Sequence, residues 1–181
     1  SSTALIRLFS IVIGKTLNRG DEIIITNCDH EANISPWKDL KHQGIVIKTW
    51  EFDKKSLKLE LKDLDKLMTK KTKLVAFCHT SNIFGTVHPV KKITEFIHNR
   101  GAKVFVDGVA YAPHRLVDVK DLNVDFYVYS IYKVFGPHLG VLYGKEEHLL
   151  TLPGINHNFI SENDLPYKFQ PGGPNYELTY S

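Results

Sequence analysis

The chain has 181 residues, of which 43% are hydrophobic and 24% charged, so it can bury one substantial core. Its net charge of +3 is small and its only basic cluster, residues 70–73, is typical of a solvated loop, which argues against a nucleic-acid partner. No apolar run approaches the length of a membrane span, and no signal peptide is visible. The two cysteines, Cys28 and Cys78, are not spaced as metal ligands usually are. They favour a reducing, cytoplasmic compartment and a protein without disulfides or a metal site.

Six short apolar runs are expected to form strands. Most are rich in β-branched or aromatic residues and nearly continuous in hydrophobicity, as strands buried on both faces should be. They are Glu22 to Thr26, Ile45 to Trp50, Lys73 to His79, Lys103 to Asp107, Phe126 to Ser130 and Gly140 to Tyr143.

Amphipathic stretches lie between these runs. The first follows Glu31, and Pro36 within it is expected to delay the start of the helix. Residues 61–68 place leucines and a methionine on one helical face, and Pro89 to Arg100 repeats this pattern, with Gly101 as the expected C-cap. Repeating β-α-β units with short connections indicate an α/β fold with an open, mostly parallel sheet and helices on both faces.

The C-terminal part differs in composition. Residues 1–150 are interpreted as one α/β large domain, whereas residues 151–181 are rich in Pro, Gly, Asn and Tyr and are expected to form an irregular tail of the same domain, exposed or covered by a partner. The chain opens with Ser-Ser-Thr rather than Met and ends abruptly, so we expect an N-terminally incomplete piece of something longer.

Polar side chains gather where strands end, which is where ligands bind in such sheets. Asp107 and Ser130 each close a strand, and Lys133 follows three residues after Ser130. His79 closes another strand, and His30 follows the first strand closely. Each of these residues also has an ordinary structural explanation. An Asp at the end of a strand is often a helix cap, and a Lys in a loop is usually a solvated charge. A functional interpretation therefore depends on the order and spacing of the residues.

That order resembles class V aminotransferases, nearest to their cysteine desulfurase and selenocysteine lyase branch. The segments VDGVAYAPH (106–114) and VDFYVYSIYKVFGPHLGVLYG (124–144) carry the resemblance, and DHEANISPW (29–37) and HTSNIFGT (79–86) look like two further motifs of that branch. FQPGGPN (169–175) resembles a later Phe-Glu-x-Gly-Thr segment of the family. The resemblance implies the large domain of a fold type I transferase that depends on pyridoxal 5'-phosphate (PLP).

The resemblance also implies catalytic roles and a strand direction. Lys133 would form the Schiff base with PLP, for which its amine must be neutral. Asp107 would keep the pyridine nitrogen protonated, and His30 would stack on the ring. The last strand, from Gly140, would run antiparallel, because the turn at residues 136–137 leaves too short a connection for a parallel crossover.

Further residues would bind the cofactor. Asn82 would hydrogen-bond the phenolic oxygen, while Ser130 and the backbone amides around Thr3 would bind the phosphate at the start of the first helix. Tyr132, beside the lysine, belongs to the same set. In the family, Gly172 and Gly173 would lie near the phosphate of the neighbouring subunit, which implies a homodimer with shared active sites.

Three positions depart from the family pattern. Tyr132 stands where the family usually has His before the lysine, Ala110 where it has Gln, and Gly173 where it has Thr. The first two changes match a subgroup described as cysteine desulfurase-like.

The expected activity is removal of sulfur or selenium from a small amino acid, cysteine or selenocysteine. An aminotransferase, a β-lyase or an epimerase of the same class would share every residue named above. In the family, the desulfurase nucleophile and the carboxylate-binding arginine follow the point where this chain stops, and neither Cys28 nor Cys78 occupies the nucleophile's place. A non-catalytic, truncated α/β binding module is the alternative from another class, and Lys133 discriminates against it.

Overall fold

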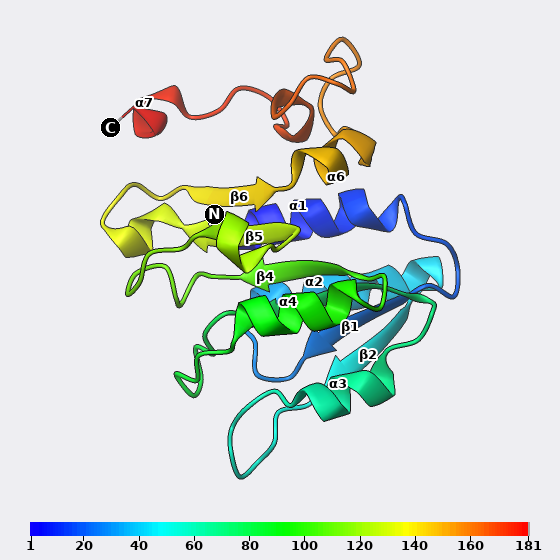
Figure 1. The fold of residues 1–181 in the computed structure, drawn as a ribbon. Helices are drawn as coiled ribbons and strands as arrows, with labels where there is room; N and C mark the ends of the chain where they lie inside the picture. The colour runs from blue at the N-terminus through cyan, green and yellow to red at the C-terminus, as the bar shows by residue number, and fades with distance from the viewer. Residues whose placement is uncertain (181) are drawn as a thin grey trace.

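A six-stranded sheet in the order β2-β1-β3-β4-β5-β6 forms the centre of the computed structural model, which describes residues 1–180 (Figure 1). The strands are β1 (Glu22–Thr26), β2 (Val46–Trp50), β3 (Thr72–Cys78), β4 (Lys103–Asp107), β5 (Phe126–Ser130) and β6 (Gly140–Gly144). All neighbouring pairs are parallel except β5 and β6, which are antiparallel. The predicted α/β fold, the six strands and the reversed last strand are therefore confirmed.

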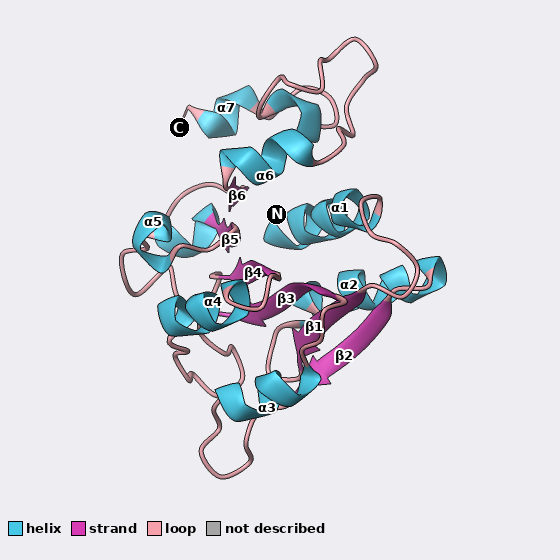
Figure 2. Ribbon diagram, turned by 45° about the vertical axis from the view of Figure 1, so that its right-hand side comes forward, coloured by secondary structure: helices cyan, strands magenta, loops and turns pink. Residues whose placement is uncertain are grey.

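Helices cover both faces of this sheet (Figure 2). They are α1 (Ser2–Gly14), α2 (Ser35–Asp39), α3 (Leu61–Leu67), α4 (Val90–His98), α5 (Val119–Leu122), α6 (Glu146–Thr151) and α7 (Tyr176–Thr179). Short 3-10 helices span Glu31–Asn33, Leu40–Gln43, Ile131–Val134 and Tyr167–Phe169. Within the described residues, no helix is both long and apolar enough to cross a bilayer.

The central strands are rich in apolar residues because they supply two cores. Ile23 and Ile25 of β1 pack with α1 and α2, whereas Ile24 between them packs with α3 and α4 on the opposite face. Successive side chains of a strand point to opposite faces, so a sheet covered on both sides needs an apolar residue at every position. Burying each of these isoleucines contributes about 1.5–3 kcal/mol.

Two helix boundaries bear on the sequence expectations. Pro36 lies in the first turn of α2, after a separate 3-10 turn at Glu31–Asn33, as expected from the proline. Gly101 is not the C-cap of α4, because the helix ends earlier and Asn99 takes that place. Gly101 instead adopts a left-handed φ of 78° in the tight turn that leads into β4.

The tail is tied to the body of the chain through Lys168, which is 1% exposed. Its Nζ donates to the carbonyl oxygens of Leu152 (2.8 Å) and Leu150 (3.2 Å) at the end of α6. The ring of Phe169 packs against Phe9 of α1 at 5.6 Å between centroids. These contacts hold the chain after α6 against α6 and α1, and Figure 1 shows this segment beyond β6, an edge strand of the sheet.

Candidate active site

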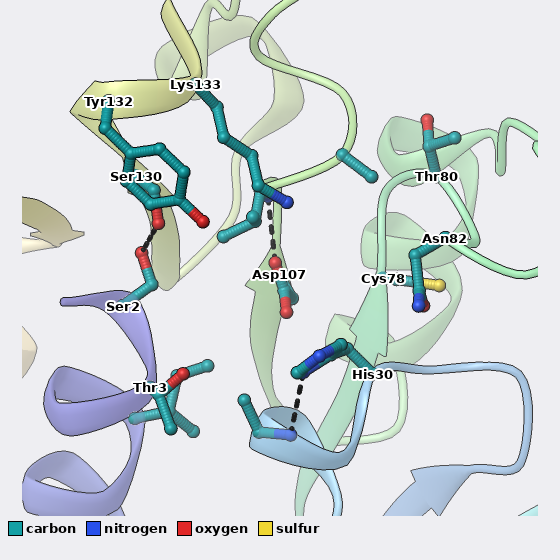
Figure 3. Close-up of a pocket in the computed structure, with 14 residues that line it drawn as sticks. Ser2, Thr3, His30, Cys78, Thr80, Asn82, Asp107, Ser130, Tyr132 and Lys133 are labelled. Atoms are coloured by element: carbon teal, nitrogen blue, oxygen red, sulfur yellow. Dashed lines mark hydrogen bonds between the residues drawn. The ribbon is translucent and has the colours of Figure 1, made fainter. Parts of the chain in front are cut away.

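One pocket lies at the carboxyl ends of the parallel strands, beside the N-terminus of α1 (Figure 3). Seven of the nine residues expected from the sequence line it: Thr3, His30, Asn82, Asp107, Ser130, Tyr132 and Lys133. Gly172 and Gly173, expected at a partner's site, do not line this one. The pocket also includes Ser2, Cys78, Thr80 and Ala110, of which sequence reasoning had noted only Ala110 as a site position.

Asp107 is the last residue of β4 and lies at the floor of the pocket, 6% exposed. Burial raises the pKa of its carboxyl group, against the opposing effects of a hydrogen bond from Val109 N (2.8 Å) and of the charges on His30 and Lys133. An additional cationic group in the pocket would therefore stabilise the ionised carboxylate.

Lys133 reaches into the pocket from the 3-10 helix Ile131–Val134, and its side chain extends toward Asp107 (Figure 3). The helix ends at Phe135, whose φ of 68° is unusual for a bulky residue and sharply turns the chain. Gly136 must follow, because a Cβ there would lie 2.2 Å from Ile131 Cγ2. The loop geometry thus directs the lysine back over the end of β4.

His30 lies on the other side of the pocket from Lys133 (Figure 3). It caps the 3-10 helix Glu31–Asn33, with Nδ1 accepting a hydrogen bond from Ala32 N at 3.1 Å. Because Nδ1 is the acceptor, the neutral ring carries its proton on Nε2. The cap fixes the plane of the imidazole, which can then stack against a planar group held between it and the lysine.

The third side of the pocket suits an anion. The Oγ atoms of Ser2 and Ser130 lie 2.8 Å apart, and the first turn of α1 presents backbone amides there. β6 approaches this helix end closely, since a Cβ on Gly140 would lie only 2.6 Å from Ser2 N. Ser2 was missed because a serine at a helix start is usually only a cap.

His79, noted as a strand-end candidate, does not line the pocket. Its ring stacks on Tyr111 at 3.4 Å between centroids, and its Nδ1 lies 2.9 Å from the Tyr127 hydroxyl. Burial and the nearby His88 lower the pKa of His79 to about 4, so it is neutral at physiological pH. Gly108 makes room for this arrangement, because a Cβ there would lie 2.1 Å from the Tyr127 ring.

Comparison with known proteins identifies the family and its sequence relatives. The family described as Aminotransferase class-V matches residues 1–180. The chain is 45% identical over 166 residues to the aminotransferase-like protein FGM3 of Gibberella zeae, covering 90% of this chain and 41% of that protein. It is 41% identical over 188 residues to the cysteine desulfurase-like protein ustD of Aspergillus flavus, covering 98% and 42% respectively.

Solved structures agree with this family. The cysteine desulfurase CsdA of Escherichia coli superimposes with a TM-score of 0.86 at 30% identity, covering 96% of this chain and 47% of that one. The apo cysteine desulfurase of Thermococcus onnurineus gives a TM-score of 0.85 at 32% identity, covering 97% and 46%. The chain therefore spans less than half the length of each of these four proteins.

Proposed function

The chain belongs to the class-V aminotransferase family, and from this premise we propose that it forms the PLP-binding part of an enzyme that acts on a small amino acid. The observation that carries the proposal is the placement of Lys133 and the buried Asp107 on one pocket, with His30 on its other side. The groups in this pocket fit the cofactor. Lys133 offers an amine, Asp107 a carboxylate and His30 an aromatic face, and the start of α1 is able to bind an anion.

Each residue then has a role that follows from its position. Lys133 would hold the cofactor through its amine, and once displaced by the amine of the substrate its Nζ would be placed to accept and return a proton. Asp107 holds a proton on the pyridine nitrogen, and the cation created there favours the ionised form of its buried carboxyl group. When bound, PLP supplies an electron sink for the carbanion formed at the substrate's α-carbon.

The remaining residues position the cofactor. His30 stacks on one face of the ring and Asn82 binds the phenolic oxygen from the loop after β3. Ser130, Ser2 and the amides around Thr3 bind the phosphate, whose double charge the start of α1 stabilises. Tyr132 lines the pocket beside the lysine and stacks on His138 at 4.9 Å between centroids, and a phenol hydroxyl there is able to donate a hydrogen bond to the cofactor.

We further propose a homodimer with shared active sites. Phe135, two residues from the catalytic lysine, and Leu116 are fully exposed in the chain by itself, which favours a partner surface over them. Gly172 and Gly173 lie outside the pocket of their own chain and are free to approach the partner's phosphate. Both cysteines are free thiols, in keeping with a cytoplasmic protein.

The preferred reaction is release of sulfur or selenium from cysteine or selenocysteine, supported by the cysteine desulfurase relatives. The aminotransferase-like relative of Gibberella zeae supports transamination as the second candidate. Supplying the complete protein with cysteine and a reductant should yield sulfide and alanine in equal amounts. Transamination of a keto acid without sulfide release would transfer the assignment to the aminotransferases.

Cofactor attachment is tested separately. The protein should be yellow after PLP is added, and borohydride should bleach it and leave a stable adduct on the peptide that contains Lys133. Lys133→Ala should lose the adduct, whereas Lys70→Ala, at an exposed loop lysine, should keep it. An adduct of equal yield in Lys133→Ala would refute the assigned lysine.

A further inference from the structure

Behind the wall of the pocket, three side chains that commonly bind metals converge: Cys28, Cys78 and His88. They come from the loop after β1, the end of β3 and the residues before α4, and all three are buried. Their ligand atoms lie within 4.8 Å of one another, with Cys28 Sγ 3.9 Å from His88 Nε2. None of the three has a role in the chemistry proposed above.

Hydrogen bonds of the backbone hold the cluster in place. His88 N donates to the carbonyl oxygen of His79 (2.8 Å), which closes the loop after β3 and returns His88 to the strand end. The Ser81 hydroxyl of the same loop donates to the carbonyl oxygen of Cys28 at 2.8 Å. The three side chains are therefore brought together by an ordered framework rather than by a chance contact of loops.

The polar groups around the cluster are incompletely satisfied. Within the described residues, His88 Nδ1 and the neighbouring Asp29 Oδ1 are buried without a hydrogen-bond partner. The contacts of the Cys28 thiol are long, 3.6 Å to Thr26 Oγ1 and 3.9 Å to His88 Nε2. Buried polar groups without partners are uncommon in native proteins, and an ion held beside Cys28 would give Asp29 Oδ1 a partner, whereas His88 Nδ1 would stay without one when Nε2 binds the ion.

Two cysteine sulfurs and one imidazole nitrogen form the donor set of the cluster. Thiolates with an imidazole are the ligand set that selects zinc over magnesium or calcium.

From this cluster we propose that the protein binds one thiophilic divalent cation, Zn²⁺, through Cys28 Sγ, Cys78 Sγ and His88 Nε2. Bond lengths of about 2.3 Å to sulfur and about 2.0 Å to nitrogen require only small shifts of the three side chains. A fourth position remains for a water molecule or for Asp29 Oδ1. Binding releases the protons of both thiols to solvent, and the ion reaches the cluster from the pocket, which Cys78 lines.

The cation would support the cofactor pocket without taking part in its chemistry. Cys78 is the register partner of Asp107 across β3 and β4, and Cys28 precedes His30 by two residues. An ion bound to both cysteines would therefore join the strand end that borders Asp107 to the loop that carries His30.

The test measures zinc in the complete, PLP-loaded protein. Reduced protein is incubated with zinc sulfate, separated from free metal in the presence of a weak chelator, and analysed by elemental mass spectrometry. We expect about one zinc per chain, and X-ray absorption showing two sulfur neighbours at about 2.3 Å and nitrogen at about 2.0 Å. The Lys133→Ala protein should bind zinc equally, which separates this result from any failure of the proposed enzymatic function.

Variants locate the site. Cys28→Ser and His88→Asn should weaken zinc binding at least tenfold, whereas His42→Asn, at an exposed histidine, should leave it unchanged. Less than a tenth of an equivalent of zinc in the reduced parent protein would overturn the proposal. So would zinc bound only through oxygen and nitrogen, a result obtained on the parent protein and therefore independent of how the variants fold.

Discussion

Ser2 Oγ lies 2.8 Å from Ser130 Oγ, although the two residues are 128 positions apart in the sequence. The contact joins the first turn of α1 to the end of β5, directly before the loop of Lys133. The anion-binding end of the pocket and the lysine loop are thus connected, and a change at one end should affect the other.

Removing either hydroxyl should weaken PLP binding. Ser2→Ala and Ser130→Ala each delete a donor to the proposed phosphate, so we expect the Kd for PLP to rise roughly tenfold, or about 1.4 kcal/mol. The double variant should cost less than the sum, because each single change already breaks the bond between the two hydroxyls. Titration of the apo protein measures this, with the exposed Ser56→Ala as control; strictly additive effects would contradict the coupling.

Gly140→Ala tests the close approach of β6 to α1. The added methyl group would lie 2.6 Å from Ser2 N and 2.7 Å from Ser1 C, both backbone atoms that cannot simply rotate away. We expect a loss of about 1–3 kcal/mol in the free energy of unfolding, together with weaker PLP binding. Gly173→Ala is the matched control for unfolding, since no heavy atom lies within 4 Å of the added group. Equal stability of the two variants would show that α1 can move without cost.

Asp107→Asn should separate binding from chemistry. The amide retains the shape of the side chain but carries no charge to hold a proton on the pyridine nitrogen. We expect kcat to fall by roughly a hundredfold or more, equivalent to about 2.7 kcal/mol of barrier, with a smaller effect on PLP affinity. Steady-state kinetics measure the change, and Asp39→Asn at an exposed ion pair with Arg7 is the control. Parent-like kcat would exclude the proposed role of Asp107.

A buried charge cluster away from the pocket should govern acid stability. Burial alone would raise the pKa of Asp125, but the hydrogen bond with His98 (2.8 Å), that from Val104 N (2.7 Å) and the charge of Lys145 lower it to about 2. Because the folded pKa is depressed, the stabilisation is present above the unfolded value of about 3.9 and is lost as pH falls toward 2.

Urea unfolding at a series of pH values checks this. The difference in unfolding free energy between the parent and Asp125→Asn should shrink by about 2 kcal/mol as pH falls from about 4 to about 2. A difference that did not change with pH would mean that the charge of Asp125 contributes nothing to stability.

The sequence by itself determined the strands, their order of appearance and the reversal of the last one. Apolar runs with no alternation are compatible only with burial on both faces, and the short connection before Gly140 excludes a parallel crossover. Asp107 and Lys133 could be placed on one rim because both follow strands whose carboxyl ends meet at the same edge.

Only the tertiary structure decided which strand-end side chains enter the pocket. Cys78 and His79 are consecutive at the end of β3, but Cys78 borders the pocket, whereas His79 stacks on Tyr111 and lies against the Tyr127 hydroxyl. The contact of Ser2 with Ser130 and the convergence of Cys28, Cys78 and His88 depend on how distant segments pack. No local pattern encodes such contacts, because hydrophobic periodicity specifies which face of an element is buried but not which residue of another element it meets.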